Sequence, residues 1–153
     1  MALGAFLVSL IPYSISNQAD AILAKTRANT ALVKKLDEMI RFGKNILETQ
    51  PTMDQMNAIH WKGRREKFRT AHESEINLHQ MSKRILKQKH GVIEIKLSAW
   101  QQEKAELEAA NEKLYQEYKP LKDKMKGIME VKRQIEAVEQ AKERKYQIEQ
   151  PAR

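Results

Sequence analysis

Residues 100–135 read WQQEKAELEAANEKLYQEYKPLKDKMKGIMEVKRQI, and an apolar side chain recurs in them at every seventh position. An apolar heptad repeat of this length favours a long helix paired with another helix, because an apolar stripe left in water is costly. The stretch therefore predicts a coiled-coil-like rod. In the heptad notation abcdefg, the apolar seventh residues are the d positions, and less apolar a positions lie between them. The predicted seam consists of Trp100, Leu107, Asn111, Leu114, Tyr118, Leu121, Met125, Ile128 and Ile135.

The ends of this rod are suggested by capping residues and by proline. Ser98 is a suitable N-cap, and Gln101 stands three residues later, as in a capping box. Pro120 falls at an outward position of the repeat, where a proline costs about 3 kcal/mol. We therefore expect the rod either to bend near Tyr118 or to break there into two packed segments. The apolar pattern fades after Val138, so the tail is expected to fray.

Two further helices are predicted upstream of the rod. Residues 17–49 carry an apolar stripe with helical period, and Pro51 is expected to end that helix, with Thr52 capping a short new one. Residues 71–89 carry a second stripe, which His90 and Gly91 are expected to end. The β-branched run at 92–95 has no strand to pair with, so we interpret it as an extended link.

Composition agrees with an all-α fold of extended helices with little compact core. Charged residues make up 31% of the chain and aromatic residues 6%, and there are five Gly and four Pro, which are too few turn formers for a sheet protein. The sequence divides into three segments. They are an N-terminal apolar segment with an amphipathic helix (1–51), a basic helical segment (52–91), and a capped heptad helix with a frayed tail (92–153).

The positive charge of the chain concentrates in its middle. The formal net charge is +8, and residues 51–95 hold nine basic side chains against five acidic ones. Such an excess attracts polyanions such as nucleic acid or an anionic membrane surface. Two aromatic rings flank the densest basic stretch, so its side chains can bind phosphates and stack bases. Alternatively, the aromatics anchor a turn to the core while the cations face water. The candidate residues are Trp61, Lys62, Arg64, Arg65, Lys67, Phe68 and Arg69.

No catalytic or metal-binding constellation is evident in the sequence. The chain has no Cys, no glycine-rich phosphate loop and no nucleophile elbow. Its four histidines lack the spacing of a zinc site, so we expect no metal and no cofactor, and we interpret them as exposed helix residues: His60, His72, His79 and His90.

The apolar run at residues 2–13 is too short to span a bilayer. A signal peptide needs a basic residue before its apolar stretch, and no Lys or Arg precedes this one. Residues 19–21 nevertheless have the small-x-small form of a cleavage site. We therefore expect a cytoplasmic protein without a membrane partner.

Several motifs of the chain occur in the same order in a known family: DEMIRFGK (37–44), KFRTAHESEI (67–76), KLYQEYK (113–119) and VKRQI (131–135). Residues 35–140 thus resemble the C-terminal helical region of plasmid and transposon mobilisation relaxases of Gram-positive bacteria. In that family the catalytic domain lies upstream, with a metal-binding histidine cluster and a tyrosine that nicks DNA. Neither feature is present here, and Tyr115 and Tyr118 lack nearby ligands, so no catalytic role carries over.

The resemblance implies a non-catalytic helical region of DNA mobilisation machinery. Such a region would bind a protein partner or itself through the coiled coil, and DNA through the basic middle. The alternative is a structural homo-oligomeric coiled coil with no nucleic-acid role.

Overall fold

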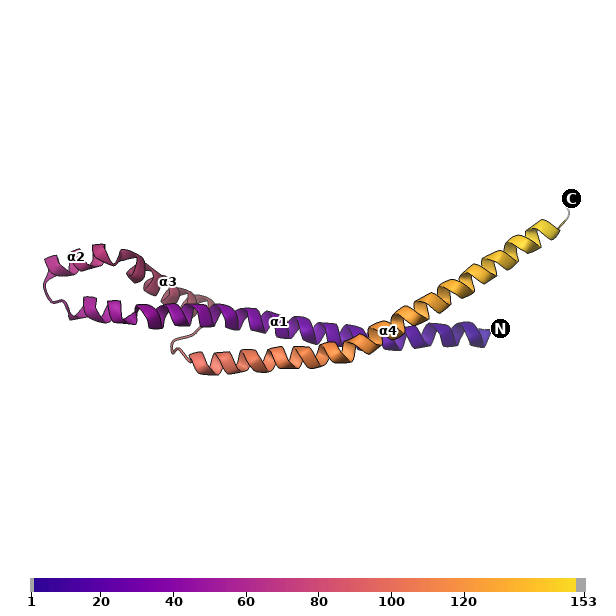
Figure 1. Cartoon of the computed structure of the whole chain (residues 1–153), viewed down its shortest axis with the longest axis horizontal. Coiled ribbons are helices and arrows are strands. Elements are labelled where there is room, and N and C mark those ends of the chain that lie inside the picture. Colours follow the sequence, from indigo (N-terminus) through magenta and orange to yellow (C-terminus); the bar gives the residue numbers. More distant parts are fainter. Residues whose placement is uncertain (1, 151–153) are drawn as a thin grey trace. The chain divides into compact units, whose positions relative to one another are not determined.

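The computed structural model describes the backbone of residues 2–150 and the side chains of residues 13–150. Four helices make up this part of the chain: α1 (Ala2–Ala58), α2 (Lys62–Ala71), α3 (Glu73–His90) and α4 (Leu97–Glu149) (Figure 1). Within residues 2–150 there is no strand, so the predicted all-α class is confirmed. The coiled-coil rod remains a prediction. Most of the apolar run at residues 2–13 lies outside the residues whose side chains the structure describes.

Helix α1 continues through Pro51, so the predicted end of this helix at Pro51 and the cap at Thr52 are wrong. Proline removes a backbone donor, but contacts with α3 on both sides of it hold the helical path. Thr49 contacts His79 in α3 at 2.9 Å, and the Thr52 hydroxyl donates to Glu75. The helix ends at Ala58, where the chain turns with a hydrogen bond from the Ile59 N–H to the Met56 carbonyl.

Helix α3 ends as predicted at His90 and Gly91. Gly91 adopts a φ of 64°, a left-handed conformation that glycine takes without steric cost. The N–H groups of Gly91 and Val92 donate to carbonyls of the last helical turns. The link that follows is non-helical and forms no strand, as expected, and it packs its Val92 and Ile95 side chains on the core while Ile93 faces solvent.

Helix α4 begins at Leu97, one residue before the predicted cap, so Ser98 lies inside the helix. The carbonyl of Lys96 accepts a hydrogen bond from the N–H of Trp100 at 3.0 Å, and Leu97 packs on the core. The first helical turn therefore begins before Ser98 rather than after it. Of the two expected outcomes near Tyr118, a bend or a break, the break does not occur, since the helix passes through Pro120 without interruption. It continues to Glu149, so the expected fraying after Val138 is wrong.

The continuation of α4 after Val138 has a local cause. The sequence there is rich in Glu, Lys, Gln and Ala, which have high helix propensity. Upstream, Arg133 and Gln134 both bond the carboxylate of Glu130, at spacings of three and four residues that stabilise a helix surface.

The chain divides into two compact units, one formed by Asn29–Ala110 and the other by Met1–Ala28 with Asn111–Arg153. In the first unit, α3 and the start of α4 both run antiparallel to α1. The pairs Thr49–His79 and Glu38–His90 establish this direction for α3. The ion pair Asp37–Lys104, together with the approach of Trp100 to Gly43, establishes it for α4. Their shared core consists of Leu36, Met39, Phe42, Ile46, Leu86 and Trp100.

Gly43 allows the indole of Trp100 to approach the backbone of α1. A Cβ atom at this position would lie 3.1 Å from Cζ3 of Trp100 and 3.3 Å from Cγ2 of Ile95. Both distances are tighter than ordinary van der Waals contacts. A larger residue at position 43 must therefore push the indole away from α1.

We expect Gly43→Leu to destabilise the Asn29–Ala110 unit by roughly 1–3 kcal/mol, because it overpacks the contact with Trp100. Gly63→Leu is the matched control, since nothing lies within 4 Å of a Cβ atom there. Urea unfolding followed by circular dichroism measures both variants. A Gly43→Leu protein as stable as the Gly63→Leu protein would contradict the close approach of the indole.

Candidate nucleic-acid interface

Helix α2 contains the predicted basic stretch and none of its residues is buried. Trp61 precedes it in an extended conformation, and the Trp61 carbonyl accepts the N–H of Arg65 at 2.9 Å. At the other end, the His72 N–H donates to the Phe68 carbonyl, and the His72 carbonyl accepts the Ile76 N–H. The helix is thus held at its two ends, and its length is exposed to solvent.

The five cations of α2 form two rows on its surface. Lys62, Arg65 and Arg69 recur at spacings of three and four residues, while Arg64 and Lys67 are three residues apart. In the described part of the chain, none of the five forms an ion pair; Arg65 donates a hydrogen bond to Oδ1 of Asn57 at 3.3 Å. The charge of this helix is therefore not neutralised by neighbouring carboxylates.

The two aromatic rings that flank these cations differ in their surroundings. Trp61 is 79% exposed, whereas Phe68 is half-buried. The ring of Phe68 lies 4.2 Å from the ring of His72, centroid to centroid, with a tilt of 32°. Phe68 is thus partly shielded by its own turn, whereas Trp61 is open to solvent, and neither ring belongs to the buried core.

A buried polar layer between α1 and α3 was not anticipated from the sequence. His79 and Ser82 are 3% and 0% exposed, so the expectation that all four histidines are exposed is wrong for His79. The side chain of His79 contacts the Thr49 hydroxyl through Nδ1 at 2.9 Å, and Ser82 accepts a hydrogen bond from Asn45 at 3.5 Å. The Thr49 hydroxyl in turn lies 2.6 Å from the Asn45 carbonyl, to which it donates. One signal was available: His79 and Ser82 follow Ile76 at three-residue spacing, on its face of the helix.

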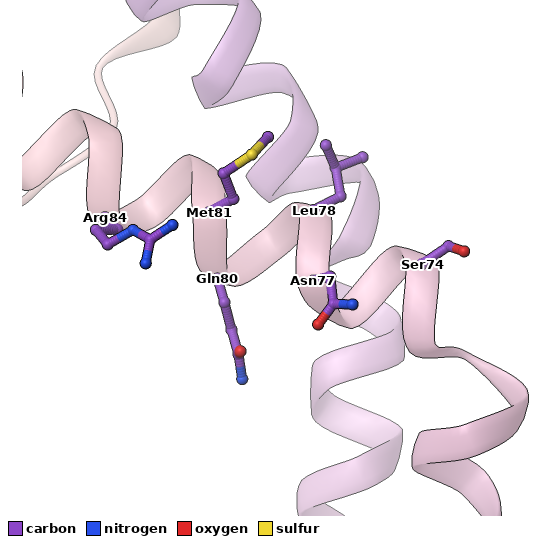
Figure 2. A pocket seen from close by; sticks show the side chains of 6 residues that line it. All are labelled: Ser74, Asn77, Leu78, Gln80, Met81 and Arg84. Atoms are coloured by element: carbon purple, nitrogen blue, oxygen red, sulfur yellow. The ribbon is translucent and has the colours of Figure 1, made fainter.

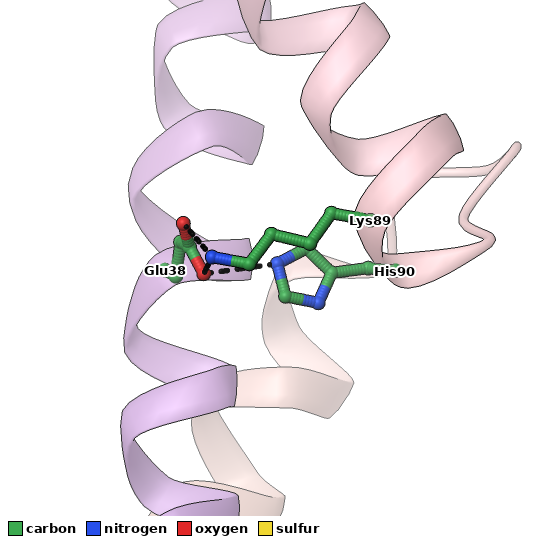
Figure 3. A network of polar contacts seen from close by, with 3 residues as sticks. All are labelled: Glu38, Lys89 and His90. Atoms are coloured by element: carbon green, nitrogen blue, oxygen red, sulfur yellow. Dashed lines mark hydrogen bonds and ion pairs between the residues drawn. The ribbon is translucent and has the colours of Figure 1, made fainter.

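A second polar cluster holds the end of α3 against α1 (Figure 3). Nζ of Lys89 lies 2.7 Å from Oε2 of Glu38, and Nε2 of His90 lies 3.1 Å from the same oxygen. The His90 side chain is only 4% exposed, so it too departs from the expectation. The hydrogen bond from Lys89 lowers the pKa of the Glu38 carboxyl below its usual value. These contacts fix the helix end and provide no catalytic geometry.

The outer surface of α3 carries a shallow depression of about 620 Å³ lined by Ser74, Asn77, Leu78, Gln80, Met81 and Arg84 (Figure 2). All six residues come from one helix, and only Arg84 among them is charged. A catalytic site needs convergent groups from more than one direction, and this surface lacks them. Among residues 2–150, no group of three His, Asp or Glu side chains is placed to hold a metal.

Most of the predicted seam on α4 is partly shielded from solvent. Trp100 is buried in the core, and the seam residues from Leu107 to Ile128 are half-buried, whereas Ile135 is 44% exposed. In the unit formed by Met1–Ala28 and Asn111–Arg153, Ala19 of α1 is only 2% exposed, which one helix alone cannot achieve. The two segments of this unit therefore pack together. In the other unit Leu107 packs against the core, so this part of the seam has a partner within the chain.

No model of a known protein family, no curated protein and no solved structure matches this chain. Within the described residues, none of the helices combines the length and apolarity needed to cross a membrane.

We expect the free energy of unfolding to decrease as the pH falls below 6.5, partly because of His79. Burial, and then the nearby Lys83, lower the pKa of His79 from its usual value of 6.5, despite the opposing effects of the Ile46 carbonyl and Asp54. The unfolded chain therefore takes up a proton at a higher pH than the folded chain. One such proton changes the free energy of unfolding by at most about 1.4 kcal/mol per pH unit.

The measurement is urea unfolding between pH 8 and pH 5 on the wild type, His79→Gln and the exposed-site control His60→Gln. The His79→Gln protein should lose less stability between these pH values than the other two. A pH dependence that is identical in all three proteins would contradict a buried neutral His79.

Proposed function

We propose that this chain is a non-catalytic helical interaction region of DNA mobilisation machinery. In this proposal α2 binds the phosphates of a nucleic acid, and α4 binds a protein partner or a second copy of the chain. The link with mobilisation relaxases rests on the resemblance of residues 35–140 alone. The binding surfaces rest on the geometry of the helices.

The observation that supports nucleic-acid binding is the unneutralised charge of α2. Five cations and one carboxylate lie in ten residues, and no residue of the helix is buried. Packing therefore does not explain this composition, because neutral helix formers would serve equally well on an exposed surface. Like charges on one short helix also repel one another, and that repulsion is relieved when phosphates replace their counterions.

The observation that supports protein binding is an exposed apolar row near the end of α4. Val131, Ile135 and Val138 are spaced by four and three residues, so they share one face of the helix. They are 54%, 44% and 54% exposed, respectively. The same row favours the alternative function, a structural homo-oligomer without a nucleic-acid role, because a second copy would cover it equally well.

We expect the full chain to bind a single-stranded oligonucleotide less tightly as the salt concentration rises. On single strands each phosphate contact contributes a log–log slope of roughly −0.7. Arg64→Ala/Arg65→Ala should weaken binding and reduce the magnitude of this slope by about 1.4, if each guanidinium holds one phosphate. Fluorescence anisotropy at several salt concentrations measures both quantities.

The matched control is Lys142→Ala/Arg144→Ala, which removes two exposed cations from α4 and changes the net charge equally. It should leave the binding close to that of the wild type. Binding that is insensitive to salt, or equally weakened by both double variants, would refute a specific role for α2.

For α4, we expect Ile135→Asp to weaken self-association at least about tenfold without loss of helicity, because the charge disrupts an apolar contact between chains. Leu114→Asp should reduce helicity as well, since Leu114 is half-buried within the chain. Sedimentation velocity and circular dichroism separate the two effects. Glu112→Lys, at an exposed position, is the control, and equal effects of Glu112→Lys and Leu114→Asp would show that the heptad assignment is wrong.

A further inference from the structure

Trp61 is a large aromatic side chain that the fold leaves in solvent. The chain has two tryptophans, and their environments are opposite. Trp100 is 7% exposed and belongs to the core, whereas Trp61 is 79% exposed and contributes no buried surface of comparable size. Burial of an indole is a strong stabilising contribution that Trp61 does not make to the folded chain.

Trp61 also stands beside the cations of α2. Arg64 and Arg65 follow it by three and four residues, and the Arg65 N–H donates to the Trp61 carbonyl at 2.9 Å, which closes the first turn. All three residues thus belong to the first turn of α2 and the residue before it. An exposed ring and two guanidinium groups are therefore present at the same end of this helix.

Phe68 does not provide a second exposed ring. It is half-buried, and the ring of His72 lies 4.2 Å from it at a tilt of 32°. The neighbouring ring and the partial burial of Phe68 reduce the ring surface on which a base could stack. Only Trp61 therefore combines an accessible aromatic face with adjacent cations in this helix.

We infer that Trp61 is a base-stacking platform that makes α2 select single-stranded over double-stranded nucleic acid. The inference rests on the proposed binding of phosphates by α2. In a duplex each base is covered by its neighbours, whereas a single strand offers the face of a base to an aromatic ring. One base stacks on Trp61 while the adjoining phosphates lie against the cations of the helix.

An anionic lipid surface is less suited to this arrangement. A helix that lies in a membrane interface needs a broad apolar face opposite its cations. The apolar rings of α2 are limited to the half-buried Phe68 and, at its start, Trp61. The cations occupy two separate rows around the helix, so no such face exists on α2.

The test uses the full chain and three probes of about twelve nucleotides: a single strand, an abasic strand of the same length, and a duplex. The abasic strand keeps the phosphates and removes the bases, so the ratio of the two single-strand affinities isolates stacking. The wild type should prefer the base-containing strand by roughly 5- to 150-fold. In Trp61→Ala this ratio should fall to about one, while the affinity for the abasic strand stays unchanged. Trp61→Phe should keep most of the preference.

Tyr146→Ala is the matched control, because Tyr146 is an aromatic residue that is 68% exposed on α4. It should retain the full preference. Tryptophan fluorescence gives a second readout: the base-containing strand should quench the wild type, and Trp61→Phe, which keeps only Trp100, should show no quenching.

An unchanged ratio in Trp61→Ala, or equal affinity for the single strand and the duplex, overturns the role of Trp61. If Arg64→Ala/Arg65→Ala still weakens binding in that case, the proposed function stands and only this inference fails. If neither the arginines nor Trp61 affects binding, both fail. Anionic vesicles form the last arm, and binding to them without binding to any oligonucleotide overturns both proposals.

Discussion

The indole of Trp100 lies against α1 where Gly43 has no side chain, and the core of the Asn29–Ala110 unit is built around this contact. Leu86 of α3 and Phe42 of α1 belong to the same buried cluster as Trp100, so this cluster joins three helices. The extended link after Gly91 is compatible with this arrangement, because it places Val92 and Ile95 on the core while α4 starts beside α1. A helix start elsewhere would leave the indole in water.

The position of α3 along α1 is then set by polar groups. Thr49, His79 and Ser82 are buried, and each has a hydrogen-bond partner in the described structure. Sliding α3 by one turn would leave these groups unpaired in an apolar contact, at a cost of about 1–3 kcal/mol for each unsatisfied group. At the far end, Glu38 holds Lys89 and His90 and limits the same movement. The polar layer therefore provides specificity where the apolar contacts provide stability.

These constraints on α1 and α3 have a consequence for α2. The last turns of α1 and the first turns of α3 are joined by the contacts Thr52–Glu75 and Thr49–His79, so the segment between the two helices has only to connect them. Its helix buries no residue, and of its side chains only Phe68 is half-buried, so most of them are free of packing requirements. This freedom is what permits five cations and an exposed indole to occupy one short element. In α4 the opposite holds up to Ile128, since its seam residues are buried or half-buried there, whereas Ile135 beyond it is exposed.

Local patterns in the sequence determined the helical class, the end of α3 at Gly91 and the non-helical link after it, because period, composition and glycine conformation act over a few residues. They also located the basic stretch, since a run of cations is visible in the sequence without knowledge of its neighbours. Only the tertiary structure decided that α1 passes through Pro51 and that α4 begins at Leu97, because contacts with α3 and the core outweigh local helix-breaking preferences. The burial of His79 and the difference between Trp61 and Phe68 were likewise decided by packing, since a residue's neighbours across helices are not encoded in its own flanking sequence.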